Sequence, residues 1–214
     1  MSDSSRQGRV SALDALADAD AAVAALRGSA DACELLVRRF ERPIYNLIAR
    51  LVQDPSLAED LTQETFLKVF RALAQYDPAQ RFSSWIFRIA HNTAVDALRA
   101  RRVPLAVPPV EADGEALDPV AALPDLSAES PEQAAGRRQL GEVLDEAIDA
   151  LRPPYRAVIV LRHHEDLDYE EIAAIMQLPL GTVKTYLHRA RRELAERLRA
   201  AGYGPSETRS GRRP

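Results

Sequence analysis

The sequence predicts an all-α fold of two small helical domains joined by a flexible, acidic, proline-rich linker. Aromatic residues make up 6% of the chain, and the abundance of Ala and Leu favours helices over sheets. Apolar residues recur at steps of three and four in two separate blocks, which is the period of an amphipathic helix. Between the blocks, residues 104–131 contain six prolines and show no helical period. This stretch is therefore predicted to be a flexible linker.

The first block, residues 29–103, predicts three helices. One apolar face is formed by Leu36, Phe40, Ile44, Leu47, Ile48 and Leu51. Pro43 lies inside this pattern and predicts a kink or a break. Asp54 followed by Pro55 marks the start of the second helix, as an N-cap and a first helical residue. The third helix follows a loop over residues 77–84, while residues 1–28 are expected to be a mobile segment with at most one short helix.

The second block, residues 132–200, begins with a clearly amphipathic helix. Its apolar face consists of Leu140, Val143, Leu144, Ala147, Ile148 and Leu151. Pro153 and Pro154 end this helix, and a short helix, a turn and two further helices are expected after it. Residues 201–214 are predicted to be a disordered tail. Each block has about 70 residues, enough for a small helical core.

Composition excludes several classes of protein. The chain contains no apolar run long enough to span a membrane, and residues 1–10 lack the apolar segment of a secretory signal. Cys33 is the only cysteine, so no intrachain disulfide and no multi-cysteine zinc site can form. Its ordinary role is that of a small buried residue, and a redox role is the alternative. These features predict a cytoplasmic protein without direct membrane insertion.

The distribution of charge indicates nucleic-acid binding more strongly than its sum. The net charge is −4, yet residues 81–102 contain five basic residues and one acid, and residues 179–199 contain six basic residues and two acids. Residues 103–135 contain seven acids and no base. Nearly all the cations are Arg, which suits bidentate contacts with phosphate and guanine, although a GC-rich genome would also enrich Arg.

A helix-turn-helix is predicted near the C-terminus. Asp168 and Glu171 form a capping-box pattern that opens one helix, residues 178–181 interrupt it, and a second helix is expected from Thr182. In this motif the second helix enters the major groove of DNA with its N-terminal end first. The outward face would carry Lys184, Thr185, His188 and Arg189, with Arg191 and Arg192 extending the positive stripe. The alternative is a solvated helix that happens to be basic.

Two long motifs in the expected order resemble the extracytoplasmic-function group of RNA polymerase sigma factors, close to the sigma-E type. Residues 169–176 and 181–191 are similar to region four of that family. Residues 58–70 resemble region 2.2, and residues 82–99 resemble the promoter-melting region that follows it. The resemblance covers residues 35–198.

The resemblance implies an alternative sigma factor rather than an enzyme. Such a protein binds core RNA polymerase and directs sequence-specific promoter recognition and transcription initiation. Its expected partners are core RNA polymerase, promoter DNA and, as is common in the family, an anti-sigma factor. No cofactor, metal or small-molecule substrate is expected.

The resemblance also implies three functional surfaces. The residues expected at the minus-thirty-five element are Thr182, Lys184, Thr185, His188, Arg189, Arg191 and Arg192. Those expected at the minus-ten element are Tyr76, Phe82, Ser83, Ser84, Arg88, Asn92, Arg99, Arg101 and Arg102. The contacts with core polymerase are expected from Asp60, Leu61, Gln63, Glu64 and Phe66. Many relatives carry a larger aromatic residue at the position of His188, so the promoter sequence is left open.

Within the minus-ten group, Asn92 matches the position that bonds a flipped base in the family. Single-stranded bases are read by stacking on aromatic rings and by bonding of their edges. Tyr76 and residues 82–84 would wall the pocket for that base, while the arginines would follow the backbone. Trp85 is expected in the hydrophobic core rather than in the pocket.

Three alternative readings fit the sequence less well. A helix-turn-helix regulator of the LuxR type shares residues 181–185, but its receiver domain would show alternating strands and helices in the first block. An adaptor that binds only protein would not need a basic recognition helix. A metal site at residues 163–166 is disfavoured because adjacent residues point in different directions and the HExxH spacing is missing.

Overall fold

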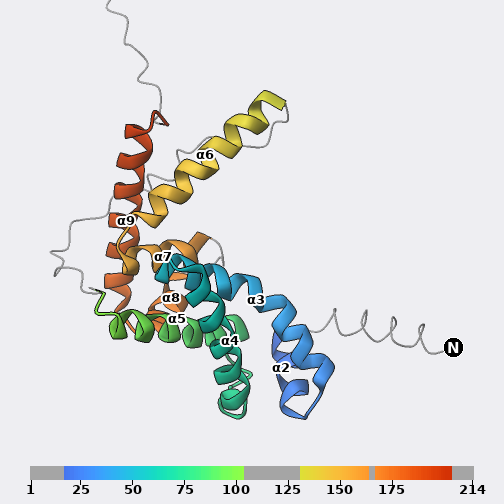
Figure 1. The fold of residues 1–214 in the computed structure, drawn as a ribbon. Coiled ribbons are helices and arrows are strands. Elements are labelled where there is room, and N and C mark those ends of the chain that lie inside the picture. Colours follow the sequence, from blue (N-terminus) through green and yellow to red (C-terminus); the bar gives the residue numbers. More distant parts are fainter. Residues whose placement is uncertain (1–16, 104–130, 164–166, 204–214) are drawn as a thin grey trace, which may run out of the picture.

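The computed structural model describes residues 17–103, 131–163 and 167–203. All regular structure in these ranges is helical, which confirms the predicted all-α fold (Figure 1). Helix α2 (Asp18–Leu26) precedes the first block, which contains α3 (Ala30–Val52), α4 (Pro55–Ala72), the short 3-10 helix η1 (Leu73–Gln75) and α5 (Phe82–Ala100). The second contains α6 (Pro131–Asp149), α7 (Pro153–His163), α8 (Tyr169–Met176) and α9 (Leu180–Ala200).

Helix α2 is the one short helix that the sequence allowed within residues 1–28, but it is packed on the first domain. Its alanines Ala21, Ala22 and Ala25 are buried against α3, and Asp18 forms an ion pair with Arg39 at 2.6 Å. Small side chains give this helix only a weak apolar pattern in the sequence, yet they allow close packing of two helices. Gly28, with φ of +90°, then makes the turn into α3.

Two local predictions for α3 and α4 have different outcomes. Pro43 lies within α3, which runs unbroken from Ala30 to Val52, so of the predicted kink or break the break is wrong. The apolar face around Pro43 is fully packed, and Ile44, Leu47 and Ile48 are completely buried. Asp54 caps α4 as predicted by accepting a hydrogen bond from the Leu57 N–H at 3.1 Å, with Pro55 at the first helical position.

The second block contains the expected helix-turn-helix, with a turn that differs from the prediction. The capping box is confirmed: Asp168 accepts from the Glu171 N–H, and Glu171 accepts from the Asp168 N–H. Helix α8 ends at Met176, and Gln177 takes the left-handed conformation with φ of 56°. Helix α9 begins at Leu180 rather than at Thr182, so Gly181 lies in its first turn.

The two blocks pack against each other. Helix α5 lies along α8, and α3 lies against α7. Buried side chains from α2 to α9 belong to one contiguous hydrophobic cluster. In Figure 1, α6 projects away from the packed helices, and of its predicted apolar face only Ala147 and Ile148 are buried, with Leu151 just beyond it. The linker and the C-terminal tail lie almost wholly outside the described residues.

Candidate nucleic-acid interface

Helix α9 has one buried apolar face and one exposed polar face. Val183, Leu187, Ala190, Leu194 and Leu198 are buried on the side of α9 that faces α6, α7 and α8. On the other side, Lys184 and Arg192 are exposed, and Thr182, Thr185, His188 and Arg189 are partly exposed. The Thr185 hydroxyl donates to the Gly181 carbonyl at 2.8 Å, so the hydroxyl is held against its own helix. The structure thus brings six of the seven predicted residues onto one accessible face.

Arg191 does not belong to that face, which corrects its predicted place in the positive stripe. It is only 8% exposed, because it lies four residues after Leu187 and three before Leu194 on the inward side. One terminal guanidinium nitrogen, Nη2, lies 3.4 Å from Nε2 of His163 at the end of α7. Arg191 therefore ties the recognition helix to α7 instead of pointing toward DNA.

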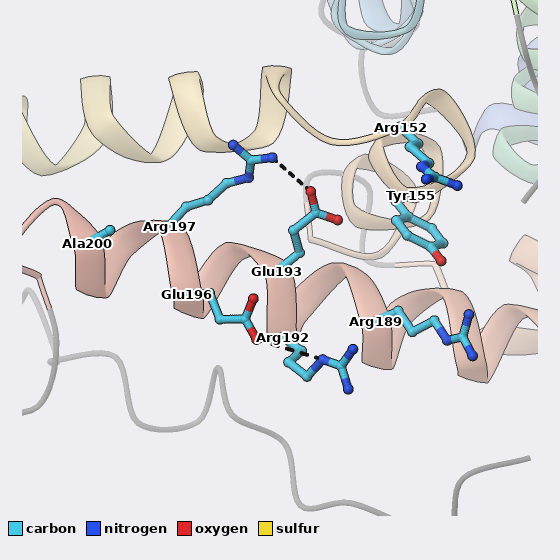
Figure 2. A pocket seen from close by; sticks show the side chains of 8 residues that line it. All are labelled: Arg152, Tyr155, Arg189, Arg192, Glu193, Glu196, Arg197 and Ala200. Atoms are coloured by element: carbon cyan, nitrogen blue, oxygen red, sulfur yellow. Dashed lines mark hydrogen bonds and ion pairs between the residues drawn. The ribbon is translucent and has the colours of Figure 1, made fainter.

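A hollow of about 640 Å³ lies beside the C-terminal half of α9, between that helix and the turn from α6 to α7 (Figure 2). Arg197 pairs with Glu193 at 2.8 Å, and Arg192 pairs loosely with Glu196 at 3.9 Å. Figure 2 shows Arg189 on the same helix, joined to neither of these carboxylates, and Arg152 projecting from the opposite wall. Charges in the last turns of α9 are thus partly neutralised within the helix, whereas Arg189 keeps its positive charge available.

The loop before α5 is held by an aromatic cluster. Tyr76, Phe82 and Trp85 are 8%, 2% and 6% exposed, and the rings of Tyr76 and Phe82 lie 5.2 Å apart in an edge-to-face arrangement. The Tyr76 hydroxyl donates to the Gln80 carbonyl at 2.7 Å, and burial raises the pKa of this tyrosine. Trp85 lies in the core as predicted. The two other rings fix the shape of the loop, but in this arrangement neither offers an open face to a base.

The polar minus-ten candidates line α5 and its C-terminal end. Ser83, Ser84, Arg88 and Asn92 are partly exposed, and Arg99, Arg101 and Arg102 are exposed. Arg101 pairs with Asp54 at 3.1 Å and Arg99 with Asp96 at 3.4 Å. Both pairs are solvent-exposed and weak enough to be replaced by phosphate.

The residue beside Asn92 is an unusual buried group that sequence reasoning did not single out. His91 is 7% exposed, and its Nδ1 atom has no hydrogen-bond partner among the residues that the structure describes. Burial lowers the pKa of His91 to about 4 and outweighs the opposing effect of Asn92, so the ring is neutral at pH 7. His91 thus belongs to the buried side of α5, and Asn92, the next residue, is partly exposed.

The predicted polymerase-binding residues lie on two different faces of α4. Asp60, Gln63 and Glu64 are exposed, whereas Leu61 and Phe66 are buried in the first domain. Glu64 forms an ion pair with Lys68 at 2.8 Å. Sequence reasoning missed Leu67, which is 57% exposed and lies one turn after Gln63 and Glu64. The sequence signal that could have identified Leu67 is its position on the acidic, outward side of an amphipathic helix.

Some kinds of site are not found in the part of the chain that the structure describes. Residues 17–103, 131–163 and 167–203 contain no cluster of three or more His, Cys, Asp or Glu side chains suited to a metal ion. Residues 164–166, which belonged to the rejected metal motif, lie outside this part. No helix within the same ranges is long and apolar enough to cross a membrane.

The all-helical fold with a capped helix-turn-helix in its second block is that of a helical DNA-binding protein. Family comparison makes this specific: residues 36–103 match the model of Sigma-70 region 2, and residues 141–194 match that of Sigma-70, region 4. The chain belongs to the extracytoplasmic-function sigma factors of RNA polymerase.

Similar curated proteins span most of the chain. The RNA polymerase sigma-H factor of Pseudomonas aeruginosa is 38% identical over 174 residues, which cover 80% of this chain and 89% of that protein. The ECF RNA polymerase sigma factor SigW of Bacillus subtilis is 33% identical, covering 81% and 92%. The ECF RNA polymerase sigma-E factor of Escherichia coli is 36% identical, covering 77% and 85%.

A similar solved structure is that of CnrH in complex with the cytosolic domain of CnrY, with a TM-score of 0.60 and 26% identity, covering 86% of this chain and 97% of that one. The sigma factor RpoE of Bartonella quintana, in complex with the anti-sigma factor NepR, shares the fold with a TM-score of 0.56 at 23% identity, covering 78% and 96%. The function predicted from sequence is confirmed: the chain is an alternative sigma factor, not an enzyme, and directs core RNA polymerase to promoters.

Proposed function

We propose that the exposed face of α9 reads the minus-thirty-five element as duplex DNA. The supporting observation is the division of α9 into a buried apolar side and an outward side with Lys184, Thr185, His188 and Arg189. Long polar side chains near the start of a recognition helix reach base edges in the major groove. Arg192 would follow the phosphate backbone, and binding is therefore expected to fall steeply with salt.

Helix α5 is the proposed reader of the minus-ten element. Asn92 is partly exposed beside the buried His91, so its amide remains accessible to a flipped base. Ser83, Ser84 and Arg88 lie toward the N-terminal end of the same helix, and Arg99, Arg101 and Arg102 lie at its C-terminal end. This order suits capture of a single strand along the helix, with arginines at its phosphates.

Polymerase binding is assigned to the exposed side of α4. Asp60, Gln63, Glu64 and Leu67 lie at helical spacing and combine acidic, polar and apolar groups on one face. Such a face fits a basic amphipathic helix of the polymerase. The predicted domain of residues 29–103 would carry polymerase binding and minus-ten recognition, and that of residues 132–200 would carry minus-thirty-five recognition. An anti-sigma factor as a further partner and a cytoplasmic location are inferred from the family.

Reconstituted transcription tests the assignment. Purified full-length chain is combined with core polymerase and a promoter library randomised at both elements, and run-off products are sequenced. The wild-type protein should select one pair of elements. Substitution at Lys184 or Arg189 should relax selection only at minus thirty-five, and substitution at Asn92 only at minus ten. A chain that bound duplex DNA but did not associate with core polymerase would overturn the proposal.

A further inference from the structure

Glu171 connects the two domains through the same carboxylate that caps α8. Its Oε1 accepts from the Ser84 hydroxyl at 2.7 Å, and its Oε2 accepts from Arg81 at 3.0 Å and from the Asp168 N–H at 2.9 Å. The Glu171 side chain is 13% exposed, so it is largely removed from water by the helices around it. The start of α5 is thus bonded to the start of the helix-turn-helix.

A second set of polar contacts joins α3 to the end of α6. Arg50 binds the carboxylates of Asp145 and, at 2.8 Å, Asp149. Gln53 donates to the Asp149 carbonyl at 2.6 Å. Burial lowers the pKa of Arg50, but the hydrogen bonds and charges of the two carboxylates outweigh it, and the net shift is upward. The half-buried guanidinium, which is always charged, thus has its charge compensated by two carboxylates of the opposite domain.

The two polar sets flank an apolar contact. Helix α5 packs on α8, α3 packs on α7, and the hydrophobic cluster continues from one domain into the other. A hollow of about 410 Å³ remains beside Arg50, lined by residues of α3, the start of α4, Asp149 and Val160. The two domains are therefore held together by polar contacts on either side of a shared apolar contact, and the hollow beside Arg50 leaves part of their interface unfilled.

This closed arrangement is incompatible with simultaneous promoter contacts, an argument that rests on the proposed function. The two elements lie about 25 base pairs apart, or roughly 85 Å at the rise of B-DNA. A domain of about 70 residues has a radius of gyration of roughly 11 Å, so two touching domains cannot span that distance. The first helix of a helix-turn-helix also crosses the DNA backbone, and in this structure α5 covers α8.

We propose that the free chain is held closed by an ionic latch, consisting of Arg50 with Asp145 and Asp149 and of Glu171 with Arg81 and Ser84, which keeps duplex DNA from α8 until the domains separate. Closure reduces the fraction of chains that are open and able to bind the minus-thirty-five element. The measured affinity for this element is proportional to that open fraction. The latch is a property of the free chain, so its test does not need polymerase.

Arg50 provides the sharpest test because it lies outside the proposed DNA and polymerase surfaces. Arg50→Glu places like charges against Asp145 and Asp149. Arg27→Glu is the matched control, since Arg27 is exposed on the turn after α2 and makes the same change in net charge. Asp145→Arg combined with Arg50→Glu restores an ion pair with reversed polarity, and Asp145 suits this role because its side chain is 60% exposed.

Two measurements on the full-length variants decide the question. Small-angle X-ray scattering should give Arg50→Glu a larger radius of gyration than wild type, with Arg27→Glu unchanged and the double variant returned toward wild type. Binding of a minus-thirty-five duplex at fixed salt should tighten about two- to tenfold for Arg50→Glu relative to Arg27→Glu. Equal dimensions for all four proteins, or an opened chain that binds the duplex no more tightly than an Arg27→Glu control that does bind it, would overturn the latch. Scattering is independent of DNA, so failure of the proposed promoter contacts would be recognised separately.

Discussion

The hydroxyl of Ser84 on α5 donates a hydrogen bond of 2.7 Å to Glu171 on α8, and this bond joins the proposed minus-ten reader to the helix-turn-helix. Glu171 also completes the capping box with Asp168. One carboxylate therefore contributes both to the start of α8 and to the domain interface.

Glu171→Ala should lower the free energy of unfolding by about 1 kcal/mol, because α8 loses half of its capping box. Glu171→Gln keeps an oxygen that accepts from the Asp168 N–H and should retain most of that stability. Urea unfolding followed by circular dichroism measures both. Glu170→Ala, at the neighbouring position in the same turn, is the control and should change stability little. Equal destabilisation by Glu170→Ala and Glu171→Ala would show that the cap contributes nothing specific.

Arg189→Ala should reduce discrimination at the minus-thirty-five element by about 1–3 kcal/mol for each base that the guanidinium reads. The reason is the position of Arg189 on the outward side of the first half of α9, where a guanidinium can reach a base edge. Competition binding between the selected duplex and duplexes with single substitutions measures the change. Arg199→Ala, in the last turn of α9, removes the same charge from an exposed position and should weaken all duplexes alike. Unaltered discrimination in Arg189→Ala would rule out a base contact.

Asn92→Ala should slow open-complex formation much more than it weakens binding of the closed promoter. The amide of Asn92 is proposed to bond a base that is exposed only after melting. Permanganate reactivity of the melted strand and duplex affinity are measured on the same holoenzyme. Asn92→Ala should also lower the affinity of the holoenzyme for a template that is already single-stranded at minus ten. An equal reduction of duplex binding and melting would contradict the flipped-base role.

Leu67→Ala should weaken association with core polymerase by roughly 1–2 kcal/mol, the range of a moderate interface residue. It should hardly change the free energy of unfolding, since the side chain is 57% exposed in the free chain. Leu26, which is 52% exposed on α2, supplies a matched Leu→Ala control outside the proposed surface. Binding is measured by fluorescence anisotropy of the labelled chain. If both variants bound core polymerase like wild type, Leu67 would have no part in the interface.

Stability should fall as the pH is lowered from about 6.5 to about 4, in part because of His91. Its pKa is lowered to about 4 in the folded chain, so between these values the unfolded chain binds one more proton. The contribution of neutral His91 to the free energy of unfolding is fully present above the unfolded pKa and is lost as the pH falls from about 6.5 to about 4. It amounts to about 3 kcal/mol. Urea unfolding at pH 7 and 4.5 measures the loss, which should be smaller in His91→Gln. His188→Gln, at a partly exposed position, is the control; the same pH dependence in His91→Gln and wild type would contradict the assignment.

Much of the fold and of the recognition helix could be predicted from sequence because the relevant signals are local. The Asp54 and Asp168 caps and the apolar faces of α3 and α9 depend on neighbouring residues and on helical periodicity, and both caps were found in the structure. Of the kink or break expected at Pro43, the break was wrong, and the packing of α2 was missed, because contacts between distant segments override a weak local preference. Arg191 was misplaced because its basic charge was given more weight than its position between Leu187 and Leu194.

The sequence alone determined the helical class, the order of the two domains, the capped helix-turn-helix and the family to which the chain belongs. Only the tertiary structure decided that Tyr76 and Phe82 are buried, that Leu67 is left exposed, and that Arg50 meets Asp145 and Asp149 across the domains. The physical reason is range: helix periodicity and capping act within a few residues, whereas burial and ion pairing between positions almost 100 residues apart depend on how complete helices pack.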